Sequence, residues 1–256
     1  MKYIAFLLSL LVACTSNNTT NTTVEKVNDQ VNENDLIGSW TFSTKDSIGF
    51  VTGLAIVTDG YYSVSRFDLE GSRFLYTLGG SWELDSNVFV ETYEFNTLDS
   101  TKVGQTDRFQ IEVKDNLLIF SELGETWEKA DDGTPGALSG AWLITGRQRD
   151  GQISRRVPGV RKTMKILSGT RFQWIAYNIE TAQFFGTGGG AYTTTDSLYT
   201  ENIQFFSRNP DRVGASLEFQ YSIDSGEWHH SGFSSKGDPM YEIWTPRAML
   251  DKVTVE

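Results

Sequence analysis

The chain has 256 residues, a formal net charge of −11 at pH 7, one cysteine and two histidines. The acidic surplus argues against a nucleic-acid-binding protein, because neutralising phosphates requires an excess of Lys and Arg. One cysteine excludes an internal disulfide, and with only two histidines it makes a structural zinc site implausible. We therefore expect no nucleic-acid partner, no metal and no cofactor.

The N-terminus carries an export signal. Lys2 is followed by an apolar run that is too short to span a bilayer. The run ends in Leu11-Val12-Ala13-Cys14, which resembles the lipobox of bacterial lipoproteins. The resemblance implies that residues 1–13 are a signal peptide, that Cys14 is lipidated, and that the protein is anchored in the bacterial cell envelope, at the outer membrane. The alternative is a plain secretory peptide with a chance cysteine.

Polar segments divide the remaining chain. Residues 14–35 are rich in Asn, Thr and Glu without apolar periodicity, which predicts a disordered tether. Residues 131–137 combine Asp, Gly, Thr and Pro and predict a linker. Residues 36–130 and 138–250 are then the two expected domains.

The two domains are copies of one pattern. Gly79-Gly80-Ser81-Trp82 matches Gly189-Gly190-Ala191-Tyr192, and Glu91 matches Glu201, always 110 positions apart. A constant separation over a long block indicates a tandem duplication. The second copy gains residues within 150–159 and within 232–239, and we expect both gains to be loops.

Turn residues cut each copy into eight short strand candidates. In the second copy these lie near residues 141–148, 161–167, 170–177, 183–193, 197–207, 213–223, 227–233 and 240–245. Neither copy has a convincing helical stripe. Eight sequential strands in about 100 residues predict an all-β chain of two tandem eight-stranded up-and-down barrels, because closing a sheet removes its exposed edges.

Both copies begin with Gly-x-Trp, as Gly38-Ser39-Trp40 and as Gly140-Ala141-Trp142. This motif resembles the first-strand signature of lipocalins (calycins), in which the Trp plugs the closed end of the barrel. The resemblance implies two lipocalin-like barrels, similar to uncharacterised bacterial lipocalin-like secreted proteins. Lipocalins often carry a late Arg that covers this Trp, and Arg247 is the candidate in the second copy. The first copy offers only Lys129.

Strand alternation predicts which side chains meet inside each barrel. The second copy has Tyr199, Trp228 and His230 where the first has the apolar residues Phe89, Leu118 and Phe120. The candidate ligand-binding residues are Trp174, Tyr192, Tyr199, Glu201, Tyr221, Trp228 and His230. Each also has a structural interpretation, because small barrels fill their interiors with such side chains.

Two groups of charged residues need partners or an explanation. A carboxylate that points into a barrel is destabilising unless it is paired. We therefore expect Glu91 and Glu201 each to have the same kind of partner in its own barrel, such as a Tyr hydroxyl or an Arg. A His230–Glu201 acid/base pair is chemically attractive, but no nucleophile elbow, phosphate loop or metal cluster accompanies it.

The second group, which we call the cationic segment, is either a solvated loop or a basic rim for an anionic partner. It contains Arg147, Arg149, Arg155, Arg156, Arg161, Lys162, Lys165 and Arg171.

The leading expectation is a cell-envelope lipoprotein that binds or carries a small, partly apolar ligand in the second barrel, with an anionic group as one option. Its partners would be an apolar or amphipathic molecule and, through the lipid, the membrane. The first alternative is a structural or interaction lipoprotein with filled barrels. The second is an enzyme that uses His230 and Glu201, so catalysis stays open. A cavity of about 300 Å³ or more favours binding.

Overall fold

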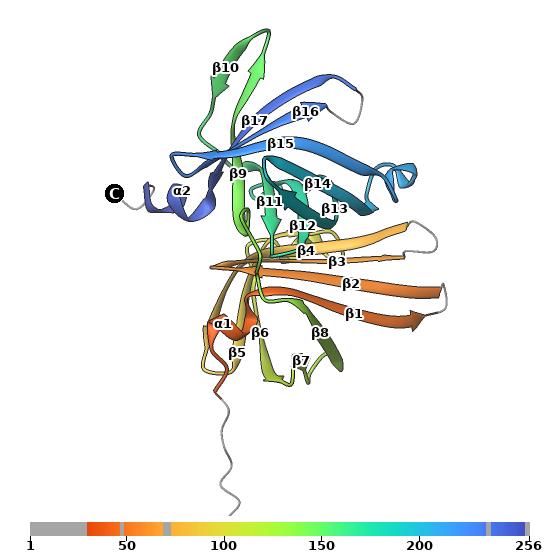
Figure 1. Cartoon of the computed structure of the whole chain (residues 1–256). Coiled ribbons are helices and arrows are strands. Elements are labelled where there is room, and N and C mark those ends of the chain that lie inside the picture. The colour runs from red at the N-terminus through yellow and green to blue at the C-terminus, as the bar shows by residue number, and fades with distance from the viewer. Residues whose placement is uncertain (1–29, 47–48, 69–72, 234–236, 254–256) are drawn as a thin grey trace, which may run out of the picture.

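The computed structural model describes residues 30–46, 49–68, 73–233 and 237–253. The predicted signal peptide, Cys14 and most of the predicted tether lie outside these residues. Two closed eight-stranded antiparallel barrels lie one above the other (Figure 1). This confirms the predicted all-β class and the tandem barrels. No helix in the described part of the chain is long and apolar enough to cross a membrane.

The first barrel follows chain order, and its last strand pairs with its first. Its strands are β1 (Gly38–Asp46), β2 (Gly49–Thr58), β3 (Tyr61–Asp68), β4 (Arg73–Asp85), β5 (Val88–Asn96), β6 (Thr106–Lys114), β7 (Leu117–Phe120) and β8 (Glu125–Asp131). A 3-10 turn, η1 (Ser100–Lys102), joins β5 to β6. A short helix, α1 (Glu33–Leu36), precedes β1, and Val31 before it is buried. Ordered structure thus begins inside the segment 14–35 that was predicted to be tether.

The second barrel repeats this order and closes through pairing of β17 with β9. Its strands are β9 (Gly140–Arg149), β11 (Arg161–Leu167), β12 (Arg171–Asn178), β13 (Gln183–Thr195), β14 (Leu198–Phe206), β15 (Ser216–Asp224), β16 (Glu227–Phe233) and β17 (Pro239–Pro246). The turn η2 (Pro210–Arg212) joins β14 to β15, and helix α2 (Arg247–Val253) follows β17.

The first insertion of the second copy contains a strand and not only a loop. β10 (Gln152–Arg155) pairs with the end of β9, and this hairpin projects beyond the barrel (Figure 1). Asp150 and Gly151 at its tip both have positive φ, at 49° and 79°. Two such residues form the tight turn that matches the twist of a β-hairpin.

The Gly-x-Trp motifs place one indole in the same way in each barrel. Trp40 Nε1 donates to the carbonyl of Leu36, and Trp142 Nε1 donates to the carbonyl of Leu138, both at 2.9 Å. Gly38 opens the first motif at a φ of 124°, where a Cβ atom would lie 2.0 Å from a backbone carbonyl oxygen of β8. Only glycine fits at that position.

The expected Arg cover of the second indole is wrong. The guanidinium of Arg247 lies 4.0 Å from the ring centre of Tyr61, in the first barrel. Of the two Gly-x-Trp indoles, the one in the first copy has a cation over its ring, because Lys129 Nζ lies 4.9 Å from the ring centre of Trp40. Arg247 instead pairs with Glu94, a partly buried carboxylate on β5 of the first barrel.

An apolar joint connects the two barrels. Leu54 and Ile56 of β2 pack in one buried cluster with Met164 and Ile166 of β11. Alternate residues of these strands face their own barrel interiors, so β2 and β11 are buried on both faces. Burying such a side chain fully contributes about 1.5–3 kcal/mol. The apolar outer faces therefore hold the barrels together.

Polar contacts complete the joint. Arg247 Nη1 donates to Glu94 Oε2 at 2.7 Å, and the Tyr177 hydroxyl donates to the same oxygen at 2.5 Å. Burial raises the pKa of Glu94, but Arg247 and Tyr177 outweigh that effect and hold the pKa below its ordinary value. Asp131, predicted as the first linker residue, instead ends β8 and accepts hydrogen bonds from the backbone N–H and the hydroxyl of Thr170 in the second barrel.

Candidate functional site

A cavity of about 560 Å³ lies inside the second barrel. This volume falls within the range of about 300–1,000 Å³ that is usual for small-molecule sites. Much of its wall is apolar, provided by Trp174, Ile203, Phe206, Leu217, Phe219 and Trp244. Charged side chains from β9, β11, β14 and β17 interrupt this wall, together with an imidazole from β16.

The seven predicted site residues are brought to one interior, but they divide into two groups. Trp174, Glu201 and His230 line the cavity. The other four, Tyr192, Tyr199, Tyr221 and Trp228, belong to or pack against the core cluster beside it. The ring of Tyr199 lies in the middle of this cluster, fully buried. These four residues support the site and do not form its surface.

Glu201 is neutralised by a lysine within the barrel. Lys165 Nζ donates to Glu201 Oε1 at 2.8 Å, and the Tyr199 hydroxyl donates to the same oxygen at 2.9 Å. Both charged side chains are about 6% exposed. The ammonium group also lies 4.8 Å from the ring centre of Trp228 and 5.4 Å from that of Trp244, close enough for cation–π attraction. The sequence reading assigned Lys165 to the cationic segment, so it missed this pairing.

His230 is buried without a hydrogen-bond partner for either ring nitrogen. Its Nδ1 lies 3.7 Å from Glu242 Oε2, which is too long for a hydrogen bond. Burial lowers the pKa of His230 to about 4, helped by the charge of Lys165, so the ring is neutral near pH 7. The anticipated His230–Glu201 pair does not form, because Glu201 is held by Lys165 and Tyr199.

Glu242 is a site residue that the sequence reading missed. It lies opposite His230 across β16 and β17, and opposite Arg147 across β17 and β9. Arg147 Nη2 lies 3.1 Å from Glu242 Oε1. Burial raises the pKa of Glu242, but the polar imidazole of His230 and the positive charges of Arg147 and Lys165 outweigh burial and lower it, so the carboxylate is ionised. A signal was present in the repeat, because Glu125 occupies the equivalent place in the first copy.

Two arginines at the mouth of the cavity are not neutralised. Arg161 and Arg208 are exposed and also line the cavity. The guanidinium of Arg161 lies 4.2 Å from the ring centre of Phe185, and Arg208 donates to the Phe185 carbonyl. Neither arginine has a carboxylate partner in an ion pair among the described residues. Both charges are therefore available to a ligand.

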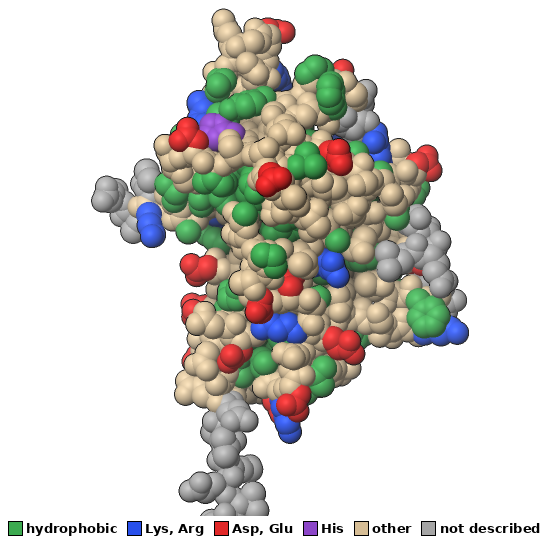
Figure 2. Space-filling view, viewed as in Figure 1, with side chains coloured by type: hydrophobic (Ala, Val, Ile, Leu, Met, Phe, Trp, Pro, Cys, Tyr) green, Lys and Arg blue, Asp and Glu red, His purple; other side chains and the backbone are tan. Residues whose placement is uncertain are grey.

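The cationic segment does not form one basic rim. Arg161 lies at the mouth, Lys165 lies inside, and Arg171 lies at the opposite end of the β11–β12 pair. Arg155 is paired with Glu227 on β16. Figure 2 shows acidic and basic side chains scattered over one face of the molecule. Among the described residues that line the cavity, the arginines without a carboxylate partner are the two at its mouth.

The first barrel has a smaller cavity, of about 230 Å³. Its sequence positions equivalent to Arg161, Lys165, Arg208 and His230 are occupied by apolar residues, namely Val51, Ala55, Leu98 and Phe120. Its own cation is Arg66, which lies 2.6 Å from Glu125 and 4.7 Å from the ring centre of Trp127. The first cavity is thus smaller, and its arginine is already paired.

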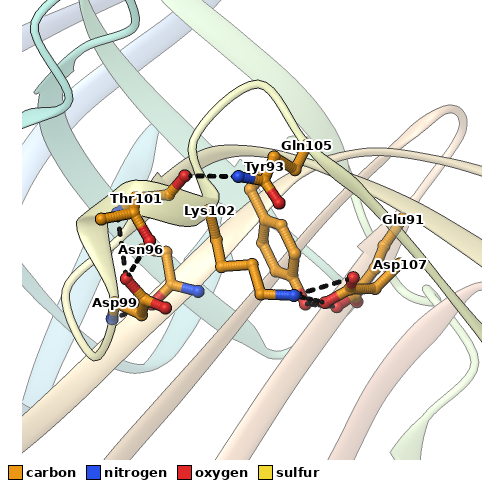
Figure 3. Close-up of polar contacts among 8 residues, drawn as sticks. All are labelled: Glu91, Tyr93, Asn96, Asp99, Thr101, Lys102, Gln105 and Asp107. Atoms are coloured by element: carbon orange, nitrogen blue, oxygen red, sulfur yellow. Dashed lines mark hydrogen bonds and ion pairs between the residues drawn. The ribbon is translucent and has the colours of Figure 1, made fainter.

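The glutamate that matches Glu201 has a different environment. Tyr93 donates to Glu91 and, at 3.0 Å, to Asp107, and Lys102 Nζ lies 3.0 Å from the same Asp107 (Figure 3). The cation therefore neutralises Asp107 and not the inward carboxylate. Burial raises the pKa of Glu91 to about 7, although the hydrogen bond from Tyr93 opposes this rise.

Comparison with known protein families finds a match to the second barrel. Residues 137–252 match the model of a family described as a domain of unknown function, DUF4488. The match runs from the end of the linker through β9–β17 and into α2, so it contains the whole second cavity. No curated protein matches the chain.

Proposed function

We propose that the second barrel binds a small amphipathic molecule with an anionic group. The observation that carries this proposal is the cavity of about 560 Å³ with Arg161 and Arg208 at its mouth, neither paired with a carboxylate among the described residues. The apolar body of the ligand would lie against Trp174, Phe206 and Phe219. Its anionic group would lie between the two guanidinium groups.

The electrostatics of the chain support an anion. A guanidinium offers forked donors that match a carboxylate or phosphate, and hydrogen bonds to charged groups contribute about 1.5–3 kcal/mol each. The chain as a whole carries −11, so a general attraction for anions is not expected. We expect a local attraction at the mouth, where Arg161 and Arg208 lack carboxylate partners among the described residues.

The proposal also covers the type of barrel and the cellular location of the chain. We propose that both barrels are lipocalin-like and that the chain is a lipoprotein anchored in the bacterial cell envelope, at the outer membrane. The buried indoles of Trp40 and Trp142 and the sequential strand order support the first statement. The sequence Leu11-Val12-Ala13-Cys14 supports the second. Binding in the envelope would make the protein a carrier or a store for its ligand.

The alternatives have less support in the second barrel. A filled scaffold fits the first barrel better, because its cavity of about 230 Å³ is below the range of usual ligand sites. Catalysis by His230 and Glu201 lacks the contact it needs, because Glu201 is bonded to Lys165 and Tyr199. Binding in the second barrel remains the function that the geometry supports best.

Ligand binding can be tested with the fluorescent anionic amphiphile 1-anilinonaphthalene-8-sulfonate. We expect one saturable site per chain, displaced by dodecanoate and not by dodecyltrimethylammonium. The double variant Arg161→Gln/Arg208→Gln should weaken binding at least about tenfold, since two charge-assisted contacts are lost. The matched control Arg108→Gln/Lys114→Gln, on the first barrel, should bind as the parent does. Equal competition by the cationic detergent, or the absence of a saturable site, would contradict the proposal.

Anchoring requires a separate test. Cys14→Ser removes the only thiol that could carry lipid. We expect the parent protein to partition into the detergent phase after cloud-point separation and the variant to remain in the aqueous phase. A variant that partitions like the parent would show that Cys14 does not anchor the chain.

A further inference from the structure

The imidazole of His230 lies in the wall of the second cavity, packed among aromatic rings. It is 2% exposed and lines the cavity, and both ring nitrogens lack hydrogen-bond partners. Its ring centre lies 4.4 Å from that of Phe219, 5.2 Å from that of Trp228 and 5.7 Å from that of Tyr199. Three aromatic rings thus surround the imidazole and separate it from bulk solvent.

The neighbouring charges decide which nitrogen carries the proton. A neutral imidazole has one N–H donor and one acceptor nitrogen. The ionised Glu242 lies 3.7 Å from Nδ1 and favours the tautomer with the proton there. Nε2 is then an acceptor. Lys165, the cation inside the same cavity, donates to Glu201 instead.

The first barrel has an apolar side chain at the position equivalent to His230. Phe120 occupies the position of His230 there, and it also lines a cavity. A buried acceptor without a donor destabilises its surroundings, so an unpaired Nε2 is a cost that the first barrel avoids. A purely hydrocarbon ligand would leave Nε2 unpaired, whereas a ligand with an O–H or N–H group would satisfy it.

We propose that the ligand of the second barrel carries a hydrogen-bond donor on its apolar body, and that this donor binds Nε2 of His230. The ligand class is then a hydroxylated amphipathic anion, held at its charged end by Arg161 and Arg208 and along its body by His230. This inference rests on the proposed function, because it assumes an anionic amphiphile in the cavity. It adds selectivity for a polar group within the apolar part.

The test compares octadecanoate with its mid-chain monohydroxylated isomers by isothermal titration calorimetry. We expect at least one hydroxylated isomer to bind about tenfold more tightly than octadecanoate, which corresponds to about 1.4 kcal/mol. His230→Phe should remove this preference while octadecanoate binds as before. The matched control is His229→Phe, which changes the adjacent histidine, whose Nδ1 lies 2.6 Å from the Tyr241 hydroxyl. It should keep the preference.

The outcomes separate the inference from the function. If octadecanoate and all isomers bind the parent protein equally well, the inference is wrong and the proposed function stands. If none of them binds, the proposed function itself fails. Should His230→Phe not fold, the ¹⁵N chemical shift of His230 Nε2 in the parent protein replaces it. That shift should move with the preferred isomer and stay with octadecanoate, and an unchanged shift with both overturns the inference.

Discussion

The two barrels share a topology and a pair of inward glutamates, yet they satisfy those glutamates differently. Glu91 is bonded by a tyrosine hydroxyl and has a pKa raised to about 7 by burial, whereas Glu201 is paired with Lys165. Glu125 is paired with Arg66, whereas Glu242 lies between Arg147 and His230. An equivalent buried acid therefore does not imply an equivalent site.

The exchange of cations also changes the space inside. In the first barrel the guanidinium of Arg66 lies over the rings of Phe42 and Trp127, at 4.2 and 4.7 Å. The second barrel has Ala176 at the equivalent position, and its cavity is about 560 Å³ against about 230 Å³. Side-chain size and charge, not strand order, make only the second barrel suitable for a ligand of usual size.

The largest effect is expected from a substitution that breaks the Lys165–Glu201 ion pair. Lys165→Met leaves Glu201 buried without its cation, and removing one partner of a buried pair typically costs about 3–5 kcal/mol. We expect this loss in the free energy of unfolding measured by urea titration at pH 7. Arg66→Met in the first barrel should cost less, because the side chain of its partner Glu125 is 25% exposed and can be hydrated.

A matched double variant tests the reason for that loss. Lys165→Met/Glu201→Gln removes both charges and should recover much of the stability lost in Lys165→Met. If Lys165→Met and Arg66→Met cost the same, or the double variant recovers nothing, then charge pairing does not distinguish the barrels.

The second largest expected effect is a dependence of the free energy of unfolding on pH, which arises from Glu91 in the first barrel. Folded Glu91 holds a proton up to about pH 7, whereas the unfolded chain releases it near pH 4.5, so the stability that Glu91 contributes is complete below pH 4.5 and is lost as pH rises to 7. A shift of this size corresponds to about 3 kcal/mol. Glu91→Gln should therefore gain stability relative to the parent between pH 4.5 and pH 7.5. A constant difference across that range would contradict the raised pKa.

The third and smallest effect has the opposite sign in the second barrel. The unfolded chain protonates His230 near pH 6.5, whereas the folded chain does so near pH 4, so its contribution is present above pH 6.5 and is lost as pH falls. His230→Phe should be within about 1 kcal/mol of the parent at pH 7, and more stable than the parent by about 2 kcal/mol at pH 5. Urea titrations at the two pH values measure this difference. A variant that loses stability on acidification as the parent does would show that His230 is not held neutral.

The repeat and the strand alternation predicted much of this molecule. The constant separation of Glu91 and Glu201 placed both carboxylates on corresponding inward faces, and the structure has them in corresponding cavities. The opposite directions of His229 and His230 also followed from alternation. These features depend on local chain geometry, which a sequence carries directly.

Lys165 shows why the sequence pattern did not predict the positively charged residues inside the second barrel. On β11 the apolar residues Met164 and Ile166 suggest the inward face by ordinary alternation, but they pack into the joint with the first barrel. The inward positions are therefore the polar ones, Arg161, Thr163 and Lys165. Because the outer face of β11 is buried against the first barrel, Met164 and Ile166 point outward and these polar residues point inward, which is the reverse of the usual alternation. Contacts such as Arg247 with Glu94 join residues far apart in the chain and have no periodic signal.

The most direct test of the account is a crystal structure of the protein soaked with bromine-labelled dodecanoate, with the bromine located by anomalous scattering. We expect one bromine peak per chain inside the second barrel, near Trp174 and Phe219, with the carboxylate between Arg161 and Arg208. A peak inside the first barrel, or an empty second cavity at saturating ligand, would contradict the claim that only the second barrel binds such a molecule.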